Sequence, residues 1–284
     1  MARPPISKPS AGNFVSNSFG VIRSRRASSV TFMGRLILNG FDGLVNVMNG
    51  FLLIDKPGGI TSHDVVDAVR RVAGIRAVGH AGTLDPFATG LLILGLGPAT
   101  KKLGELIGLD KTYEATLTLG ATSDTFDRDG VITVGAHPSV RPSADRSGQT
   151  HGSAPTESEI ESVLDQFRGG YDQRAPIFSA KKIKGKKLYE LARAGTATEE
   201  MRPIKHVTIS ELSILDAQYP ILRLRIVCSS GTYIRSLADD IGRALGVGAY
   251  LSELRRTSIG TWSVNNAIPL KNLNKSDLDK ILIK

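Results

Sequence analysis

The sequence lacks the residues on which several classes of protein depend. Its 284 residues include a single cysteine, Cys228, which excludes an internal disulfide framework. Five scattered histidines give no support to a Cys/His zinc site. No apolar run approaches the roughly 18 residues that a membrane-spanning helix requires. Neither a Walker A sequence nor a G-x-G-x-x-G sequence is present, so no motif indicates a nucleotide cofactor.

The charge balance is basic but uneven. The chain has 36 Lys and Arg against 27 Asp and Glu, a net charge of +9. Such a charge favours a polyanionic partner, although a merely basic surface would give the same number. Six of the basic residues and one of the acidic residues lie in residues 1–47. The rest of the chain has 30 basic and 26 acidic residues, a net charge of +4. A basic binding surface in the body of the protein must therefore be local.

Residues 1–47 are rich in Ser, Arg, Gly and Asn and show little periodicity, so we expect them to be disordered. Two interpretations compete for this segment. It is either an extension outside the folded domain, with Met48 standing just before the first strong strand, or an organelle transit peptide, for which Arg-rich and acid-poor composition is typical. We favour the extension.

Strand and helix signals are mixed without a regular βαβ repeat, which predicts an α+β fold with a largely antiparallel sheet. Alternation over 111–120 predicts a half-buried strand. Thr61-Ser62 and Gly74 predict the limits of a helix from about Asp64 to Ala73. Further strands are expected at 50–54, 91–96, 131–134, 204–215, 221–228 and 257–264, and further helices at 99–107, 156–168, 188–194, 230–245 and 249–256. Residues 135–155 are predicted to form a loose insertion.

The segment 79–90, GHAGTLDPFATG, places one carboxylate in a loop of unusual composition. Asp85 precedes Pro86, which restricts its backbone to extended conformations, and the glycines permit turns that other residues would forbid. Most Asp residues in such loops only form turns. A carboxylate on a rigid loop is nevertheless a candidate nucleophile. Whether Asp85 is a nucleophile or a turn residue therefore depends on which other functional residues the chain could bring to it.

Three other places supply such residues. Tyr113 lies on the apolar face of the 111–120 strand, where it is either a core aromatic or a residue of a site. Arg235 is predicted in the first turn of a helix, where the helix dipole disfavours a cation, so it is either exposed or paired with an anion. A lysine cluster predicts a phosphate-binding loop or else a solvated face; its members are Lys181, Lys182, Lys184, Lys186 and Lys187.

With these residues the chain resembles the bacterial tRNA pseudouridine synthase B (TruB) family, over about residues 49–270. The segment 79–90 resembles the signature loop of that family. Other similar blocks follow in the same order and spacing: Asp55-Lys56-Pro57 through Thr61-Ser62, Lys111-Thr112-Tyr113 with Thr122, Asp124 and Asp129-Gly130, Phe178-Ser179-Ala180, 185–190, 229–235, and Leu254-Arg255-Arg256.

The resemblance implies a pseudouridine synthase fold and the isomerisation of uridine 55 in the T-arm loop of tRNA to pseudouridine, without a cofactor or metal. In the family pattern Asp85 is the nucleophile, Arg235 pairs with it, and Tyr113 stacks on the target base near its C5 proton. The remaining residues are expected to bind RNA: His80 fills the space of the flipped base, Tyr233 and Leu254 line the uracil pocket, and Lys56, Lys181, Lys182, Lys186 and Lys187 contact the backbone.

The resemblance also implies a domain organisation. Residues 48–270 would form the catalytic domain, with 173–195 as a thumb loop that grips RNA. The tail, 271–284, would be short and would not form the RNA-binding PUA-like domain of the family. We expect a monomer that binds the T-stem-loop of tRNA, without an obligate protein partner or a membrane. The expected location is the bacterial cytoplasm, with organelle import through 1–47 as the alternative.

Several alternatives stay open at this stage. A carboxylate could attack either the ribose or C6 of the base. Assistance to RNA folding is a possible side role or a substitute for catalysis, and an RNA-guided synthase working within a particle is a third reading. A glycosidase for small molecules is disfavoured, because such enzymes need a second carboxylate within about 5–9 Å and the loop offers one.

Overall fold

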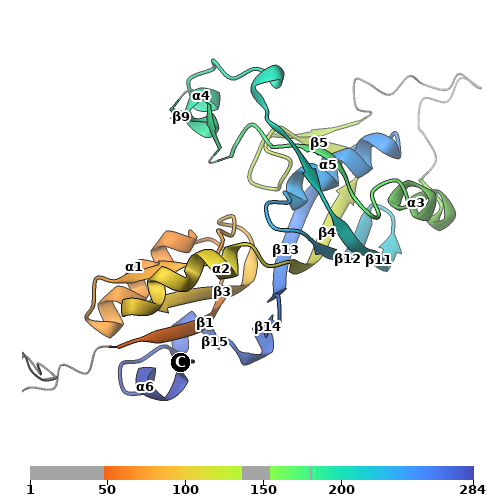
Figure 1. The fold of residues 1–284 in the computed structure, drawn as a ribbon. Helices are drawn as coiled ribbons and strands as arrows, with labels where there is room; N and C mark the ends of the chain where they lie inside the picture. Colours follow the sequence, from red (N-terminus) through yellow and green to blue (C-terminus); the bar gives the residue numbers. More distant parts are fainter. Residues whose placement is uncertain (1–47, 136–153, 180, 184) are drawn as a thin grey trace, which may run out of the picture. The chain divides into compact units, whose positions relative to one another are not determined.

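Nine strands form the main sheet of the computed structural model, which describes residues 48–135, 154–179, 181–183 and 185–284. Among these residues the order is β11-β12-β4-β13-β3-β1-β15, with β2 paired to β3 and β14 to β13 (Figure 1). The pairs β13/β3 and β1/β15 are parallel and the others antiparallel. The bounds are β1 Gly50–Lys56, β2 Val78–His80, β3 Thr89–Leu96, β4 Lys111–Leu119, β11 Ile209–Gln218, β12 Ile221–Cys228, β13 Ala249–Ile259, β14 Trp262–Ser263 and β15 Ile268–Pro269.

Helices and smaller strand pairs surround this sheet, and the predicted α+β fold is confirmed. The α-helices are α1 Ser62–Ala73, α2 Leu103–Ile107, α3 Glu157–Leu164, α4 Leu188–Arg193, α5 Ile234–Ala244 and α6 Leu278–Ile281. The small pairs are β7 Tyr171–Arg174 with β10 Ile204–Val207, β5 Ala121–Ser123 with β6 Ile132–Val134, and β8 Lys182–Ile183 with β9 Lys186–Lys187. In the part of the chain that is described, none of the helices has the length and apolar character to cross a membrane.

The predicted extension 1–47 and nearly all of the predicted insertion 135–155 lie outside the described residues. The proposed limits of the catalytic domain and of the short tail therefore stay predictions.

Local signals set the limits of α1. The Thr61 side chain accepts a hydrogen bond from the Asp64 backbone N–H, and the Asp64 carboxylate accepts one from the Thr61 N–H. This reciprocal capping lets the helix begin at Ser62, two residues before the predicted start. At the other end Gly74 adopts φ 70°, which a glycine tolerates at a helix C-terminus.

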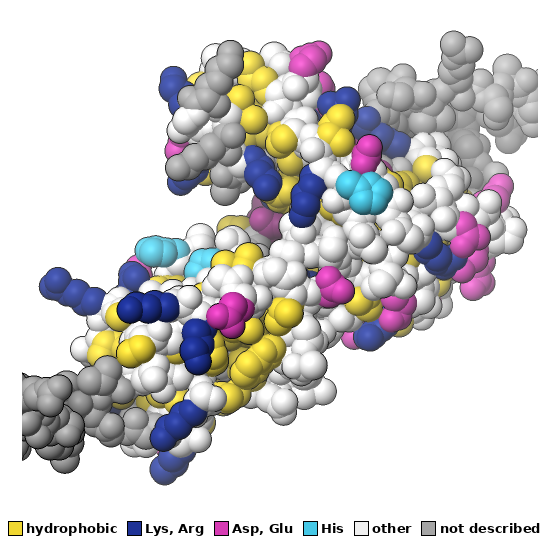
Figure 2. Space-filling model, viewed as in Figure 1, with side chains coloured by type: hydrophobic (Ala, Val, Ile, Leu, Met, Phe, Trp, Pro, Cys, Tyr) yellow, Lys and Arg dark blue, Asp and Glu magenta, His cyan; other side chains and the backbone are white. Residues whose placement is uncertain are grey.

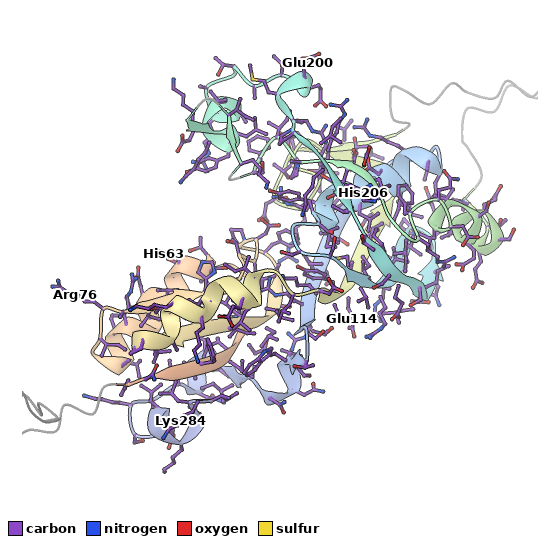
Figure 3. The ribbon with its side chains drawn as sticks, in the orientation of Figure 1. His63, Arg76, Glu114, Glu200, His206 and Lys284 are labelled. Atoms are coloured by element: carbon purple, nitrogen blue, oxygen red, sulfur yellow. The ribbon has the colours of Figure 1, made fainter. Side chains whose placement is uncertain are left out.

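The core of the sheet follows the alternation along β4. Tyr113, Ala115 and Leu117 are buried against a cluster that includes Leu237 and Ile241 of α5. Glu114, the residue after Tyr113, lies on the face of β4 that is turned away from α5 (Figure 3). The alternation therefore directs Tyr113 to the same side of the sheet as the helix that carries Arg235.

Residues 249–256 belong to a strand, which corrects the prediction of a short helix there. β13 lies between β4 and β3 and pairs with both. Its register with β4 shifts between Leu251 and Glu253 and again between Arg256 and Ser258. Each shift lengthens the step between buried side chains from two residues to three, as from Leu251 to Leu254. The buried residues of this strand are therefore three residues apart at two places, a spacing that is also typical of a helix.

The other half of the sheet has apolar contacts on both faces. On one face Leu52, Ile54 and Leu94 pack with Val65 and Val69 of α1. The opposite face packs separately, where Leu53, Leu91 and Ile93 contact Leu103 at the start of α2. This two-sided packing fixes β1 and β3, and between β2 and β3 the chain forms the loop that carries Asp85.

Candidate active site

The Asp85 loop connects β2 to β3 and is held by groups from two other elements. The Ser62 hydroxyl at the start of α1 accepts a hydrogen bond from the Leu84 N–H at 2.9 Å and lies 3.2 Å from the Leu84 carbonyl oxygen. Where the loop enters β3, Gly90 adopts φ 102° and a β-carbon there would collide with the backbone of Arg256. Asp85 is therefore presented by a loop whose two ends are fixed.

Lys56 holds the same loop from the end of β1. Its side chain is fully buried, and Nζ donates hydrogen bonds to the carbonyl oxygens of Pro57, Pro86 and Ala88 at 2.8, 3.1 and 2.8 Å. Burial lowers the pKa of Lys56 to about 8. Because the ammonium group is enclosed by loop carbonyls, the prediction that Lys56 contacts RNA is corrected: this lysine supports the loop.

Arg235, in the first turn of α5, forms the ion pair with Asp85 that the family resemblance implied. Its Nε lies 3.0 Å from Oδ2 and one terminal nitrogen lies 3.2 Å from Oδ1, a two-point contact. The Arg235 side chain is only 7% exposed, whereas that of Asp85 is 34% exposed. The guanidinium therefore fixes the carboxylate from within the protein and leaves part of it open to the pocket.

Asp127 is a second carboxylate at Arg235, and it is not among the predicted site residues. Its Oδ2 lies 3.3 Å from a terminal nitrogen of Arg235, and the side chain is 7% exposed. The Thr125 hydroxyl donates to Asp127 Oδ1 at 2.6 Å, while the Thr125 carbonyl accepts from Arg235 at 3.0 Å. Burial raises the pKa of Asp127. No local pattern distinguishes this Asp from its turn neighbours, and only the fold brings it to Arg235.

A pocket of about 510 Å³ opens over the Asp85 carboxylate, a volume typical of small-molecule sites. Figure 2 shows the surface hollowed between the segment that contains α4 and the segment that contains α1. Most of the predicted site residues line this pocket. They come from β2, the Asp85 loop, β4, the residue before β8, the start of α5 with the residue before it, and β13. They are His80, Asp85, Tyr113, Lys181, Tyr233, Arg235 and Leu254.

Two of the predicted lysines lie elsewhere. Lys186 is exposed on β9 and Lys187 is half-buried, with its Nζ 5.4 Å from the centre of the Tyr189 ring, and neither lines the pocket among the described residues. Lys182 lies in β8, and its side chain is outside what the structure describes. Contacts of these three lysines with RNA stay predictions.

Gln173 fixes the backbone from which Tyr233 and Arg235 project, a role that no local sequence pattern indicates. Its buried side chain accepts from the Tyr233 N–H at 2.7 Å and donates to the Tyr233 carbonyl at 3.0 Å. The same amide donates to the Tyr171 hydroxyl, which in turn donates to Asp240 Oδ2 at 3.0 Å. This chain of bonds joins β7 to α5, so the base of the predicted thumb loop is tied to the pocket.

Asp240 gives this network a pH dependence. Burial raises the pKa of Asp240 to about 6, from 3.8. The folded state therefore binds the Asp240 proton more strongly than the unfolded state does, and the stability this confers is lost as pH rises through about 6. We expect Asp240→Asn to gain about 1–3 kcal/mol of unfolding free energy relative to the unmodified protein between pH 4 and pH 7.5. Urea unfolding at several pH values measures this, and a difference that does not change with pH would contradict it.

Comparison with known families agrees with this geometry. The sequence model described as TruB family pseudouridylate synthase (N terminal domain) matches residues 70–234. The model described as tRNA pseudouridylate synthase B C-terminal domain matches residues 235–281. The first match contains Asp85 and Tyr113 and ends one residue before Arg235.

Three similar proteins of curated function carry the same name. Proteins named tRNA pseudouridine synthase B from Azoarcus sp. (strain BH72) and Corynebacterium diphtheriae are 45% and 44% identical to this chain, over 81% and 80% of it and 71% and 73% of their own lengths. The protein of that name from Chlamydia pneumoniae is 40% identical over 84% of this chain and 94% of its own length.

Solved structures with the same fold include a Cbf5-Nop10-Gar1 complex, with a TM-score of 0.59 and 30% identity, and an H/ACA RNP bound to a substrate RNA containing 2′-deoxyuridine, with 0.56 and 28%. Each alignment covers 82% of this chain and about half of the solved chain, 54% and 53%. The expected fold and the expected resemblance are thereby confirmed, and the chain belongs to the TruB family of pseudouridylate synthases.

Proposed function

We propose that this protein converts uridine 55 in the T-arm loop of tRNA to pseudouridine, with Asp85 as the nucleophile. Membership of the TruB family supplies the reaction class. The observation that carries the assignment of Asp85 is its two-point contact with the buried Arg235 at a pocket that Tyr113 also lines. An aspartate fixed in this way keeps a lone pair directed at the pocket without the motion of a free side chain.

The reaction needs only the residue types that the pocket holds. The Asp85 carboxylate forms a covalent bond with the nucleoside, and addition to the ribose carbon or to C6 of the base leads to the same product. This bond breaks again as the product forms, which regenerates the free carboxylate. The N1–C1′ bond breaks, the base rotates, and a C5–C1′ bond forms. C5 loses its proton and N1 gains one, so the product is an isomer of the substrate. Because no electrons are transferred overall, the chemistry requires no redox cofactor.

A nucleotide of the RNA can enter the pocket only after its base has left the stack of neighbouring bases. Extrusion costs about a few kcal/mol, which protein contacts must offset. Tyr113 offers an aromatic face, and Tyr233 and Leu254 line the same pocket. Burial lowers the pKa of His80, so its ring is neutral near pH 7 and suited to fill the space of an extruded base.

The surroundings of the pocket suit the phosphate backbone of a folded RNA loop. Lys181 is exposed at the pocket. Lys205 lies beside Gly231, and its Nζ donates to the Ser230 carbonyl. With Lys186 and Lys187 nearby in sequence, these side chains provide the local positive charge that binding to an RNA backbone requires. We extend the proposal to a protein that acts in the bacterial cytoplasm, alone and as a monomer.

Tritium release tests this proposal. A T-arm RNA labelled at C5 of uridine 55 is incubated with the protein alone, and a matched RNA carries the label at another uridine. We expect release of tritium to water from position 55 only, because that C5 proton is lost. RNA annealing without release would indicate a folding role without catalysis. Release that needs a guide RNA or further proteins would indicate a particle-dependent enzyme.

A further inference from the structure

Helix α5 begins in a way that local rules disfavour. Tyr233 is the residue just before the helix, where Ser, Thr, Asp or Asn is preferred, and its side chain lines the pocket and makes no capping bond. The first turn has no acidic residue and carries the Arg235 cation against the helix dipole. The contact with Asp85 holds the guanidinium of Arg235 but not its backbone. A helix start of this kind depends on groups outside the helix to bind its backbone.

Gln173 of β7 supplies these groups. Its Oε1 accepts a hydrogen bond from the Tyr233 N–H at 2.7 Å, and its Nε2 donates to the Tyr233 carbonyl at 3.0 Å. The same carbonyl accepts the Leu237 N–H at 3.1 Å, the bond with which the helix opens. The amide therefore binds both sides of the residue at which α5 begins. Gln173 is only 2% exposed, so water competes little for these bonds.

Further bonds hold the amide and its strand to the same helix. The Nε2 of Gln173 also donates to the Tyr171 hydroxyl at 2.6 Å, and that hydroxyl donates to Asp240, farther along α5. Both N–H groups and the oxygen of the amide are thus engaged, which fixes its orientation. The next residue of β7, Arg174, accepts at its carbonyl a hydrogen bond from the Ser236 hydroxyl at 2.8 Å. β7 is therefore a rigid support for the first turn of α5.

We propose that Gln173 is a positioning residue for the isomerisation. It fixes the backbone of Tyr233 and thereby holds Arg235 at Asp85. The proposal rests on the proposed function. Without the amide, the Tyr233 carbonyl keeps only the Leu237 N–H, and the first turn of α5 loses its tie to β7. The Arg235 backbone moves with that turn, and a displacement of about 1 Å at a reacting group costs about 100-fold in rate.

Hydrogen exchange of single amides, measured without RNA, separates a local effect from a general loss of stability. In Gln173→Met a side chain of similar size makes neither bond to Tyr233. We expect the Leu237 amide, whose acceptor is the Tyr233 carbonyl, to exchange at least about 10-fold faster than in the unmodified protein. The Leu245 amide, bonded to Ile241 at the other end of α5, should change at most about twofold. Equal acceleration at both amides, or none at Leu237, would overturn the proposal.

The kinetics of tritium release from C5 provide a second readout. In Gln173→Met we expect the maximal single-turnover rate to fall about 100-fold, while the RNA concentration at half-maximal rate changes at most about threefold. Asp172→Asn is the matched control, because Asp172 is the neighbour on β7 and its exposed side chain pairs with His206 of β10. It should leave both values unchanged. A maximal rate in Gln173→Met equal to that of the unmodified protein would overturn the proposal.

Gln173→Asn keeps the proposal testable if Gln173→Met does not fold. The amide is retained but stands one methylene farther from Tyr233, so it cannot bind both sides of that residue. We expect faster exchange at Leu237 and a maximal rate reduced about 10-fold. The unmodified rate in this variant would overturn the proposal. If the unmodified protein releases no tritium, the proposed function fails, whereas exchange at Leu237 still measures the hold of Gln173 on the helix.

Discussion

Replacing Asp85 with asparagine is expected to abolish pseudouridine formation, by about 10⁴-fold or more, and to leave RNA binding nearly unchanged. Asparagine has almost the same shape as aspartate, and its carbonyl oxygen can still accept a hydrogen bond from Arg235. The amide lacks the negative charge and the nucleophilicity needed for a covalent bond to the nucleoside. Because Asp127 also contacts Arg235, the guanidinium keeps one counter-ion in this variant, and we expect the fold to survive.

Asp55→Asn is the matched control for this substitution. Asp55 makes a similar two-point contact with an arginine, Arg255, but it lies on β1 and does not line the pocket. The loss of this partly exposed pair costs at most about 1 kcal/mol. Activity is measured by single turnover on T-arm RNA and binding by filter retention. Turnover at the unmodified rate in Asp85→Asn would remove Asp85 from the chemistry.

Replacing Arg235 with lysine should be the second most damaging change at the site. Arg235 donates to Asp85 at two points, to the carbonyls of Thr125 and Phe178, and lies beside Asp127. A lysine keeps the charge but presents a single ammonium group, which cannot span these partners. We expect turnover to fall about 100-fold, because a displacement of about 1 Å at a reacting group has this effect. Unfolding free energy should fall by about 1–3 kcal/mol as buried acceptors lose donors.

The control for this variant is on the same helix. Arg243 in the last turn of α5 pairs with Asp239 and is 43% exposed, so Arg243→Lys removes an arginine fork away from the pocket. Urea unfolding and single-turnover rates are compared for the two variants. Equal effects on turnover in both would mean that the position of Arg235 at Asp85 has no particular importance.

The parts of the fold that sequence predicted are those set by neighbouring residues. The capping of α1 by Thr61 and Asp64 and the alternation along β4 are both short-range signals. The position of Arg235 in the first turn of a helix left two alternatives, an exposed side chain or one paired with an anion, and only the family resemblance named Asp85 as the partner. The strand at 249–256 was not predictable, because its two register shifts depend on pairing with β4 and removed the period of two.

The residues that the sequence misplaced or missed all act through contacts between distant segments. Lys56 was expected at RNA from the family resemblance, yet loop carbonyls 30 and 32 residues away enclose its ammonium group. Asp127 meets an arginine more than a hundred residues along the chain, and Arg256 meets the carbonyls of the loop before Asp85. Without the fold, a lysine, an aspartate and an arginine at these positions have no feature that separates them from surface residues.

The most direct measurement is the mapping of pseudouridine at single-nucleotide resolution in a complete, unmodified tRNA transcript after incubation with this protein alone. We predict one modified position, uridine 55, in transcripts of several different tRNAs, and no modification when uridine 55 is replaced by cytidine. Modification at another position, or no modification of any transcript by the folded protein, would contradict this prediction.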